Sequence, residues 1–226
     1  MKISIFGLGY VGAVTAACLS EQGHAIIGVD VQQKKTDEIN AGRSPILEPE
    51  LDDLLQALHT AGRLSAHGDS RRAILESEVS IVCVGTPSLE SGGLDLRYIR
   101  EVCRQIAEAL QEKNADHLLI LRSTLLPGST RALVKAYFDT ILARGRVQLV
   151  YCPEFLREGT AVKDFREPSL AVMGSESGEP VAQAVELMGE SRWFQWEGAE
   201  MIKYSCNYWH ALKVAFANEI GRVCKH

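Results

Sequence analysis

Residues 3–30 carry the pattern that most constrains the fold of this chain. A short apolar run is followed by glycines spaced Gly-x-Gly-x-x-Gly, a helix-length segment, and a second apolar run that an acid closes. The glycines are Gly7, Gly9 and Gly12, and the acid is Asp30. In this order the pattern predicts a strand, a tight turn, a helix and a second parallel strand.

Each glycine of this turn has a physical role in binding a dinucleotide. The first glycine permits the turn, the second lets the backbone approach a pyrophosphate, and the third lets the helix pack closely on the strand. The phosphates would lie at the helix N-terminus, where unpaired N–H groups favour negative charge. Asp30 can accept both ribose hydroxyls and would repel a 2′-phosphate, so we expect NAD rather than NADP. The alternative is a tight turn with no ligand.

The rest of the chain continues the alternation of strands and helices. We expect strands at ISIFGLG, AIIGVD, RLSAH, VSIVCVG, HLLILRS, VQLVYC, LAVMG and WFQW. We expect helices over about 11–22, 34–41, 49–62, 70–76, 95–113, 128–144 and 178–190. This predicts an α/β fold of the Rossmann type, with a mostly parallel sheet, helices on both faces and a long C-terminal helix. We place a domain boundary after Trp196, so that 1–196 form the dinucleotide-binding domain and 197–226 begin a second, helical part.

Composition excludes several classes of partner. The net charge is −5, and the lysines and arginines are scattered, so we expect no nucleic acid. No export signal or membrane-length apolar run is present in the sequence, and we expect neither a membrane span nor export. The six cysteines form no CxxC pair, which is typical of the reducing cytoplasm, and no metal site is expected.

Two predicted strands end in hydroxyl side chains. VSIVCVG is followed by Thr86, and HLLILRS is followed by Thr124. Because ligands of open parallel sheets bind beyond the carboxyl ends of the strands, either threonine could contact the nicotinamide half of the cofactor. The alternative is that each threonine only caps a turn.

An acidic pair follows a strand in YCPEFLREGTAVKDF, residues 151–165. Glu154 and Glu158 are four residues apart, so in a helix they would share one face. Their repulsion would raise the pKa of at least one carboxyl, which suits proton transfer near neutral pH. The alternative is a solvated acidic turn.

The last segment, from Glu197 onward, reads as an amphipathic helix with two stripes. Lys203, Asn207 and His210 share one face, where an ammonium, an amide and an imidazole can hold a polyhydroxy substrate and stabilise an oxyanion. The alternative is a solvated face, although Tyr204 and Tyr208 are unusual on such a face. The apolar stripe consists of Ile202, Cys206, Trp209, Phe216, Ile220 and Val223.

These phrases together resemble a known family. ISIFGLGYVG, VCVGTPS, RSTLLPG, PEFLREGTAVKDF and AEMIKYSCNYWHALKVAFANEIG are similar to segments of the UDP-glucose/GDP-mannose dehydrogenase family, and most similar to its GDP-mannose branch. The resemblance runs over essentially the whole chain. It implies a four-electron oxidation of a sugar C6 alcohol to a carboxylate, with two NAD and a covalent thiohemiacetal and thioester.

The resemblance also implies roles for individual residues. The residues that match NAD-contacting positions, beyond the glycines, are Tyr10, Val11, Asp30, Lys35, Thr86 and Thr124. Those that match substrate-contacting positions are Glu154, Lys203, Asn207, His210 and Asn218. In the family's terms Lys203 and Asn207 steady the oxyanion and Glu154 helps to deliver the hydrolytic water. Glu158 and Thr124 would organise the site.

Two departures from the family pattern set limits on this reading. Cys152 stands where family members commonly carry asparagine, and it is a poor candidate for a replacement nucleophile. The family's nucleophilic cysteine and its second nucleotide-binding domain are not found in the 226 residues, so we expect an N-terminal portion that is incompetent for full turnover. Residues 197–226 would begin the family's central helix, and we expect a homodimer through it.

Several functions stay open at this stage. The leading one is the cofactor-binding part of a GDP-mannose dehydrogenase, with a UDP-glucose dehydrogenase as a close alternative. A β-hydroxyacid-type dehydrogenase would also carry a Lys-x-x-x-Asn helix, but it leaves PEFLREG without a purpose. A non-catalytic NAD-binding module is the third class.

Overall fold

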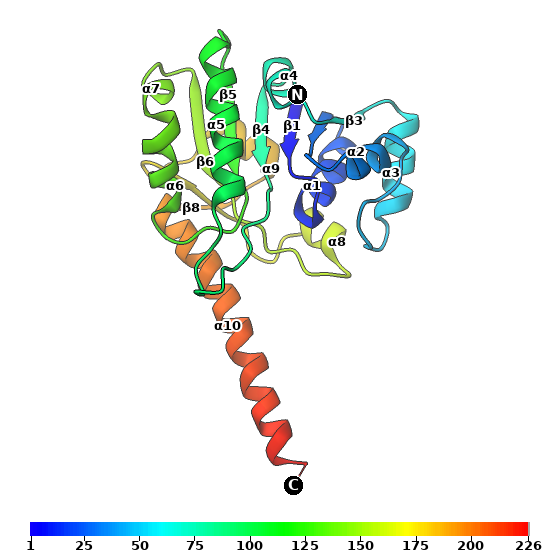
Figure 1. The fold of residues 1–226 in the computed structure, drawn as a ribbon, viewed down its shortest axis with the longest axis vertical. Helices are drawn as coiled ribbons and strands as arrows, with labels where there is room; N and C mark the ends of the chain where they lie inside the picture. The colour runs from blue at the N-terminus through cyan, green and yellow to red at the C-terminus, as the bar shows by residue number, and fades with distance from the viewer. Residues whose placement is uncertain (226) are drawn as a thin grey trace.

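An eight-stranded sheet organises the protein, which a computed structural model describes over residues 1–225 (Figure 1). The strand order is β3-β2-β1-β4-β5-β6-β7-β8. The strands are β1 (Lys2–Phe6), β2 (Ala25–Val29), β3 (Leu64–His67), β4 (Val79–Val82), β5 (His117–Leu121), β6 (Val147–Tyr151), β7 (Val172–Ser175) and β8 (Arg192–Gln195). All eight predicted strands are confirmed, and the order of the first six matches the dinucleotide-binding topology.

The sheet is mostly parallel, as predicted, but its last two strands run against the others. β6 and β7 pair antiparallel through Tyr151 and Gly174 alone, while β7 and β8 are parallel to each other. Gly174 is also the place where β7 meets the last helix. A Cβ there would lie 3.0 Å from the Cβ of Ala199 and 3.1 Å from the Cα of Trp196, so the helix packs directly on the strand.

The helices cover both faces of the sheet (Figure 1). They are α1 (Tyr10–Glu21), α2 (Gln33–Asn40), α3 (Leu51–Thr60), α4 (Ser70–Glu76), α5 (Arg97–Glu112), α6 (Ser129–Leu133), η1 (Val134–Phe138), α7 (Asp139–Leu142), α8 (Ala161–Arg166), α9 (Ala182–Met188) and α10 (Trp196–Val223). The helix predicted over 128–144 is interrupted in its middle by the π-helical turn η1. Helix α8 was not predicted.

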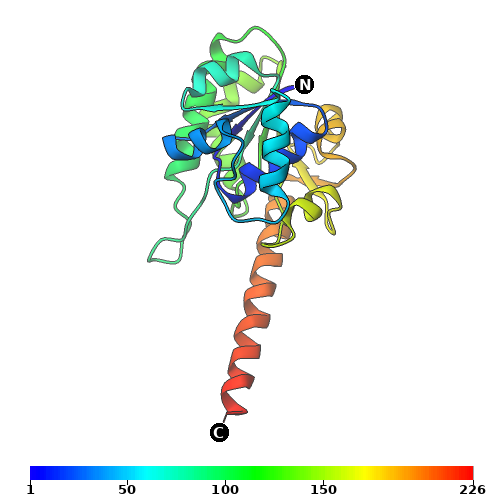
Figure 2. The ribbon, with the colours of Figure 1, turned by 90° about the vertical axis from the view of Figure 1, so that its right-hand side faces the viewer.

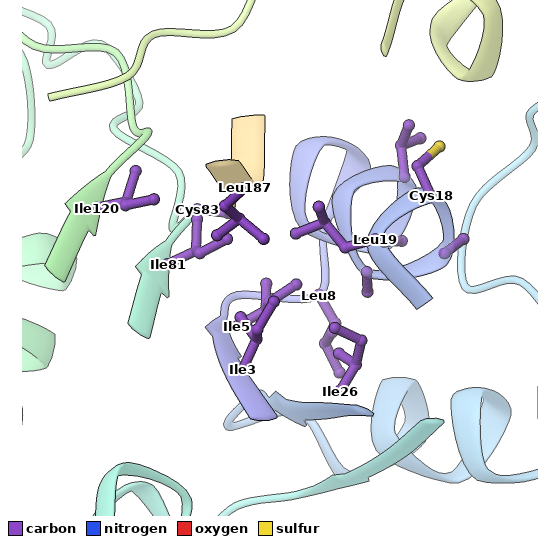
Figure 3. Packing of buried hydrophobic residues seen from close by; sticks show 14 of the residues in the cluster. Ile3, Ile5, Leu8, Cys18, Leu19, Ile26, Ile81, Cys83, Ile120 and Leu187 are labelled. Carbon is purple, nitrogen blue, oxygen red and sulfur yellow. The ribbon is translucent and has the colours of Figure 1, made fainter. Parts of the chain in front are cut away.

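Two apolar cores lie on opposite faces of the sheet, because successive side chains of a strand point to opposite sides. Ile3 and Ile5 of β1 belong to the core under α1, whereas Phe6 belongs to the core under α5. Figure 3 shows the first core, whose labelled members include Ile5, Leu8 and Leu19 of α1. Burial on both faces explains why the inner strands β1, β4 and β5 read as continuous apolar runs in the sequence.

Helix α10 is anchored in the domain at its start and projects away from it afterwards (Figure 2). Trp196, Ala199, Glu200 and Lys203 are buried. The Glu200 carboxylate accepts hydrogen bonds from the N–H groups of Gly128 (2.6 Å) and Thr130 (2.7 Å) at the start of α6. The first turns of α10 therefore belong to the packed core, and the proposed boundary after Trp196 remains a prediction.

Within residues 1–225, none of the helices combines enough length with enough apolar character to cross a bilayer.

His117 of β5 makes the stability of the fold depend on pH. Its Nε2 lies 2.8 Å from the Ser80 hydroxyl and its Nδ1 lies 2.9 Å from the Lys113 ammonium. Burial, and then the charge of Lys113, lower the pKa of His117 from 6.5 to about 3. Between these two pH values the unfolded chain binds a proton that the folded chain does not, so stability falls as the pH falls.

We predict that urea unfolding from pH 7 to pH 4 will show this loss in the unmutated chain and a flatter profile in His117→Gln. The variant will be less stable at pH 7, because a glutamine cannot reproduce both ring contacts, but it removes the group whose pKa differs between the two states. Parallel profiles for the two proteins would show that His117 does not carry the dependence.

Candidate active site

The turn between β1 and α1 requires glycine at two positions. Gly7 has φ +92°, and a Cβ there would lie 3.0 Å from the backbone of Val84. A Cβ on Gly12 would lie 1.8 Å from the carbonyl oxygen of Gly7, so no other residue fits without moving the helix. Gly9 is different, because no atom lies within 4 Å of the position of its Cβ. The turn is tight on the protein side and open beside Gly9, as the sequence pattern predicts.

The N-terminus of α1 has the features of an anion site. Its N-cap residue is Gly9, no side chain caps it, and no acid stands in its first turn. The N–H groups of Tyr10, Val11 and Gly12, together with the helix dipole, are therefore available to a negatively charged group. The open space at Gly9 and the uncapped helix fit the pyrophosphate of a dinucleotide.

Asp30 lies beside this turn, directly after β2. The carboxylate is buried and accepts hydrogen bonds from the N–H groups of Leu8 (2.8 Å) and Gln32 (2.9 Å). The Lys35 ammonium lies 3.3 Å from it. These contacts fix the carboxylate at the edge of the turn, and its remaining lone pairs suit the hydroxyls of a ribose.

Thr86 and Thr124 lie together at the ends of neighbouring strands β4 and β5. The Thr86 hydroxyl donates a hydrogen bond to the Thr124 carbonyl oxygen (2.8 Å). Both threonines line an open groove of about 610 Å³, and Asn207 of α10 lines it from the other side. The structure thus brings three of the predicted site residues together from three separate elements.

Glu154 and Lys203 form a shielded ion pair. The Lys203 ammonium lies 2.8 Å from one carboxylate oxygen of Glu154, and the two side chains are 6% and 14% exposed. The same ammonium lies 5.2 Å from the centre of the Phe155 ring. Little solvent reaches the pair, so its charges act over short distances more strongly than charges at the surface.

The prediction that Glu154 and Glu158 share a helical face was wrong. Residues 152–160 contain no helix, and Glu158 is exposed. The second carboxylate oxygen of Glu154 accepts the N–H of Leu156 (2.8 Å), which competes with a helical bond, and Gly159 has φ +86°. Helix α8 begins only after this segment. Glu154 therefore faces Lys203 rather than a second acid.

The predicted polar site residues of α10 lie partly within the domain and partly beyond its edge. Lys203 is buried and Asn207 borders the groove. His210 and Asn218 are exposed, on the part of α10 that projects away from the sheet (Figure 1). Geometry within residues 1–225 therefore supports Lys203 and Asn207 as site residues, while the roles of His210 and Asn218 remain predictions.

Cys152 has the environment of a structural thiol. It is buried after β6, and Nη1 of Arg122 lies 3.3 Å from its sulfur. Burial raises the pKa of the Cys152 thiol, and the guanidinium opposes that rise only in part. At neutral pH the thiol stays protonated, which makes it a poor nucleophile.

Sequence reasoning missed Glu48, which contacts the first residue of α1. The Tyr10 hydroxyl donates to the carboxylate of Glu48 at 2.6 Å. The same carboxylate binds N–H groups that lie 111 and 113 residues further along the chain, a separation that no local spacing reveals.

We predict that Gly9→Ala and Gly12→Ala will fail in different ways. Gly9→Ala should keep the thermal stability of the chain within a few degrees, because its Cβ meets no atom, but should weaken NAD binding by about tenfold or more by filling the phosphate side of the turn. Gly12→Ala should lower the melting temperature sharply, because its Cβ collides with the Gly7 carbonyl.

Calorimetric titration with NAD and thermal unfolding separate these two effects. Unchanged NAD affinity in a folded Gly9→Ala protein would contradict the assignment of the pyrophosphate to this turn.

Comparison with known proteins shows which family this chain is similar to. Residues 1–190 match the NAD binding domain of the UDP-glucose/GDP-mannose dehydrogenase family, and residues 197–226 match its central domain. The GDP-mannose 6-dehydrogenase of Pseudomonas aeruginosa is 48% identical over 232 residues, which cover 100% of this chain and 53% of that protein. A UDP-glucose 6-dehydrogenase of Haloferax volcanii is 34% identical and is matched over 100% of this chain and 55% of its own length.

A solved structure agrees with these matches. The crystal structure of a ternary complex of GDP-mannose dehydrogenase from Pseudomonas aeruginosa superposes with a TM-score of 0.89 at 48% identity, over 98% of this chain and 52% of that one. The chain spans about half the length of the curated relatives it matches. The resemblance seen in the sequence is confirmed, NAD is the cofactor of the matched domain, and the chain belongs to the UDP-glucose/GDP-mannose dehydrogenase family.

Proposed function

We propose that this chain provides the cofactor-binding part of an NAD-dependent sugar-nucleotide 6-dehydrogenase that oxidises GDP-mannose to GDP-mannuronate. The observation that carries the proposal is a juxtaposition at one edge of the sheet. The uncapped turn of α1 and Asp30 lie beyond β1 and β2, and the Lys203–Glu154 pair lies beyond β6. A cofactor site and a pair of charges suited to alcohol chemistry thus share the carboxyl ends of the parallel strands.

In this proposal the residues divide between binding and chemistry. NAD, when bound, accepts the hydride from the sugar C6. The α1 N-terminus holds the pyrophosphate, Asp30 with Lys35 borders the ribose, and the groove at Thr86 and Thr124 receives the nicotinamide half.

Lys203 and Glu154 act on the substrate side. The Lys203 ammonium has three N–H donors and gives one to Glu154, which leaves donors for an oxygen that becomes negative as the alcohol is oxidised. Asn207 adds an amide on the same edge of the helix, one turn further on. Glu154 holds the ammonium in place and is the acid placed to orient a hydrolytic water, while Glu158 and Thr124 are proposed to organise the site.

The sequence identities to the relatives favour GDP-mannose over UDP-glucose as the substrate. The GDP-mannose 6-dehydrogenase relative is 48% identical, whereas the UDP-glucose 6-dehydrogenase relative is 34% identical. UDP-glucose remains the alternative substrate. A β-hydroxyacid dehydrogenase is disfavoured, because the segment 153–160 then has no purpose although it supplies the partner of Lys203.

We further propose that the exposed part of α10 pairs with a second copy of the chain. Large apolar side chains are exposed along it, among them Trp209 (57%), Phe216 (67%) and Val223 (72%). Ile202, at the start of the same stripe, packs against the core, so the stripe passes from the domain onto the projecting helix. A helix with this much exposed apolar surface is typical of an interface, and a symmetric pair would cover both stripes at once.

We predict that the 226-residue chain binds NAD but forms no detectable NADH with GDP-mannose. Asn207 and His210 lie exposed on one helix and provide only one wall for the sugar, so the roughly 7–11 kcal/mol that orientation can contribute is largely missing. The measurement is absorbance at saturating NAD, with UDP-glucose and several hydroxy acids beside GDP-mannose.

The assay separates the β-hydroxyacid function from the other candidates. NAD binding without turnover agrees with the proposal and also with a non-catalytic NAD-binding module, whereas turnover of a hydroxy acid would replace the proposal by the β-hydroxyacid function. Steady production of GDP-mannuronate that is lost in Cys152→Ser would contradict our assignment of Cys152 as a structural thiol.

We predict that light scattering will show a dimer of the 226-residue chain at micromolar concentration. Replacing Trp209 and Phe216 by serine should shift the protein to a monomer, because both side chains are more than half exposed on α10 and contribute to the stripe. Thr60→Ser in α3, on the surface of the domain, is the matched control and should leave the dimer intact. A monomer at all concentrations would contradict the pairing.

A further inference from the structure

Glu48 lies at the junction between the cofactor turn and the loop that carries Glu154. It belongs to the segment between α2 and α3 and is 9% exposed. Its carboxylate accepts three hydrogen bonds: from the Tyr10 hydroxyl (2.6 Å), from the N–H of Gly159 (2.9 Å) and from the N–H of Ala161 (2.7 Å). Three donors from two separate segments thus converge on one buried carboxylate.

Only an ionised carboxylate satisfies this set of donors. Burial raises the pKa of Glu48, but the hydrogen bonds from Tyr10, Gly159 and Ala161 together lower the pKa by more than burial raises it. The pKa of Glu48 therefore lies below its ordinary value. An amide in the same place has one accepting oxygen and an NH₂ group, and the NH₂ group would face an N–H donor. The arrangement therefore discriminates between glutamate and glutamine.

The contacts of Glu48 continue to the charged pair. Tyr10 is the first residue of α1, and its hydroxyl also lies 3.1 Å from the carbonyl oxygen of Arg157. Asp164 holds the Arg157 guanidinium at 2.6 Å, which fixes the middle of the loop. At the start of the loop, Glu154 binds the N–H of Leu156 and the ammonium of Lys203, both at 2.8 Å.

We propose that Glu48 is a positioning residue that couples occupation of the cofactor turn to the ordering of residues 153–161. This inference rests on the proposed function, since it takes the turn as the NAD site and Glu154 as an acid of the reaction. A pyrophosphate on the α1 N-terminus restrains Tyr10, and Tyr10 holds Glu48 against Gly159 and Ala161. By linkage, an ordered loop strengthens NAD binding by the same factor by which NAD stabilises the loop.

The test is hydrogen exchange of the Gly159 and Ala161 amides, with and without saturating NAD, alongside calorimetric measurement of NAD affinity. In the unmutated chain NAD should slow both amides by about 5-fold or more, the lower end of typical coupling between sites. In Tyr10→Phe the ratio should fall to about 1, because the variant keeps the Glu48 bonds to both amides and loses the contacts of the Tyr10 hydroxyl with Glu48 and with the Arg157 carbonyl.

Two further variants separate coupling from a merely structural role. Glu48→Gln should also abolish the NAD-dependent slowing, and combining it with Tyr10→Phe should weaken NAD no further than Tyr10→Phe alone. Tyr137→Phe removes a phenol hydroxyl beside the core on the opposite face and should keep the ratio of the unmutated chain.

The outcomes distinguish failure of the proposed function from failure of the coupling through Glu48. If NAD does not bind, the proposed function fails and the coupling fails with it. If NAD binds and the amides exchange at unchanged rates, or if Tyr10→Phe shows the same slowing as the unmutated chain, the coupling is wrong and the proposed function stands.

Discussion

The contact between Gly12 and the Gly7 carbonyl is the constraint on which the site depends. Because Gly12 has no side chain, the first turn of α1 packs directly on the end of β1, with its N–H groups turned to the open side of Gly9. β1 also stands where the strand order changes direction, between β2 and β4. In open α/β sheets this is the place where ligands bind, so one close approach sets both the direction of the helix dipole and the position of the site.

A second set of contacts joins the substrate side to the same framework. Glu200 fastens the start of α10 to the N-terminus of α6, and one turn later Lys203 pairs with Glu154 at the end of β6. Both acids of these contacts lie in poorly solvated places, where loss of a partner leaves a charge without compensation. These contacts fix the position of the start of α10 relative to the site, and Asn207 lies one turn further on, beside the groove.

The sequence pattern predicts well what depends on periodicity and on glycine. The continuous apolar strands, the glycine turn and Asp30 follow from rules that act within a few residues, and the structure has them where they were expected. The reversal of β7 and β8 could not be read from the sequence, because the apolar pattern of a short strand is the same in either direction. The π-helical turn η1 left no signal of its own.

The segment 152–160 shows why the other contacts of the site could not be predicted from the sequence. Spacing alone placed Glu154 and Glu158 on a helix, but Lys203 and the N–H of Leu156 bind Glu154 in an irregular segment. Glu48 bonds the end of that segment from more than a hundred residues away. Such long-range satisfaction of backbone N–H groups is decided by the tertiary fold, whereas short-range spacing reports only which groups need partners.

The most direct test of the central claim is an NMR titration of the ¹⁵N-labelled chain with NAD, with NADP in a parallel experiment. Our account predicts that the amide signals of residues 7–12 and of Asp30 shift first and saturate at a lower concentration of NAD than of NADP. Shifts confined to α10 or to other surfaces, with residues 7–12 unperturbed by saturating NAD, would contradict it.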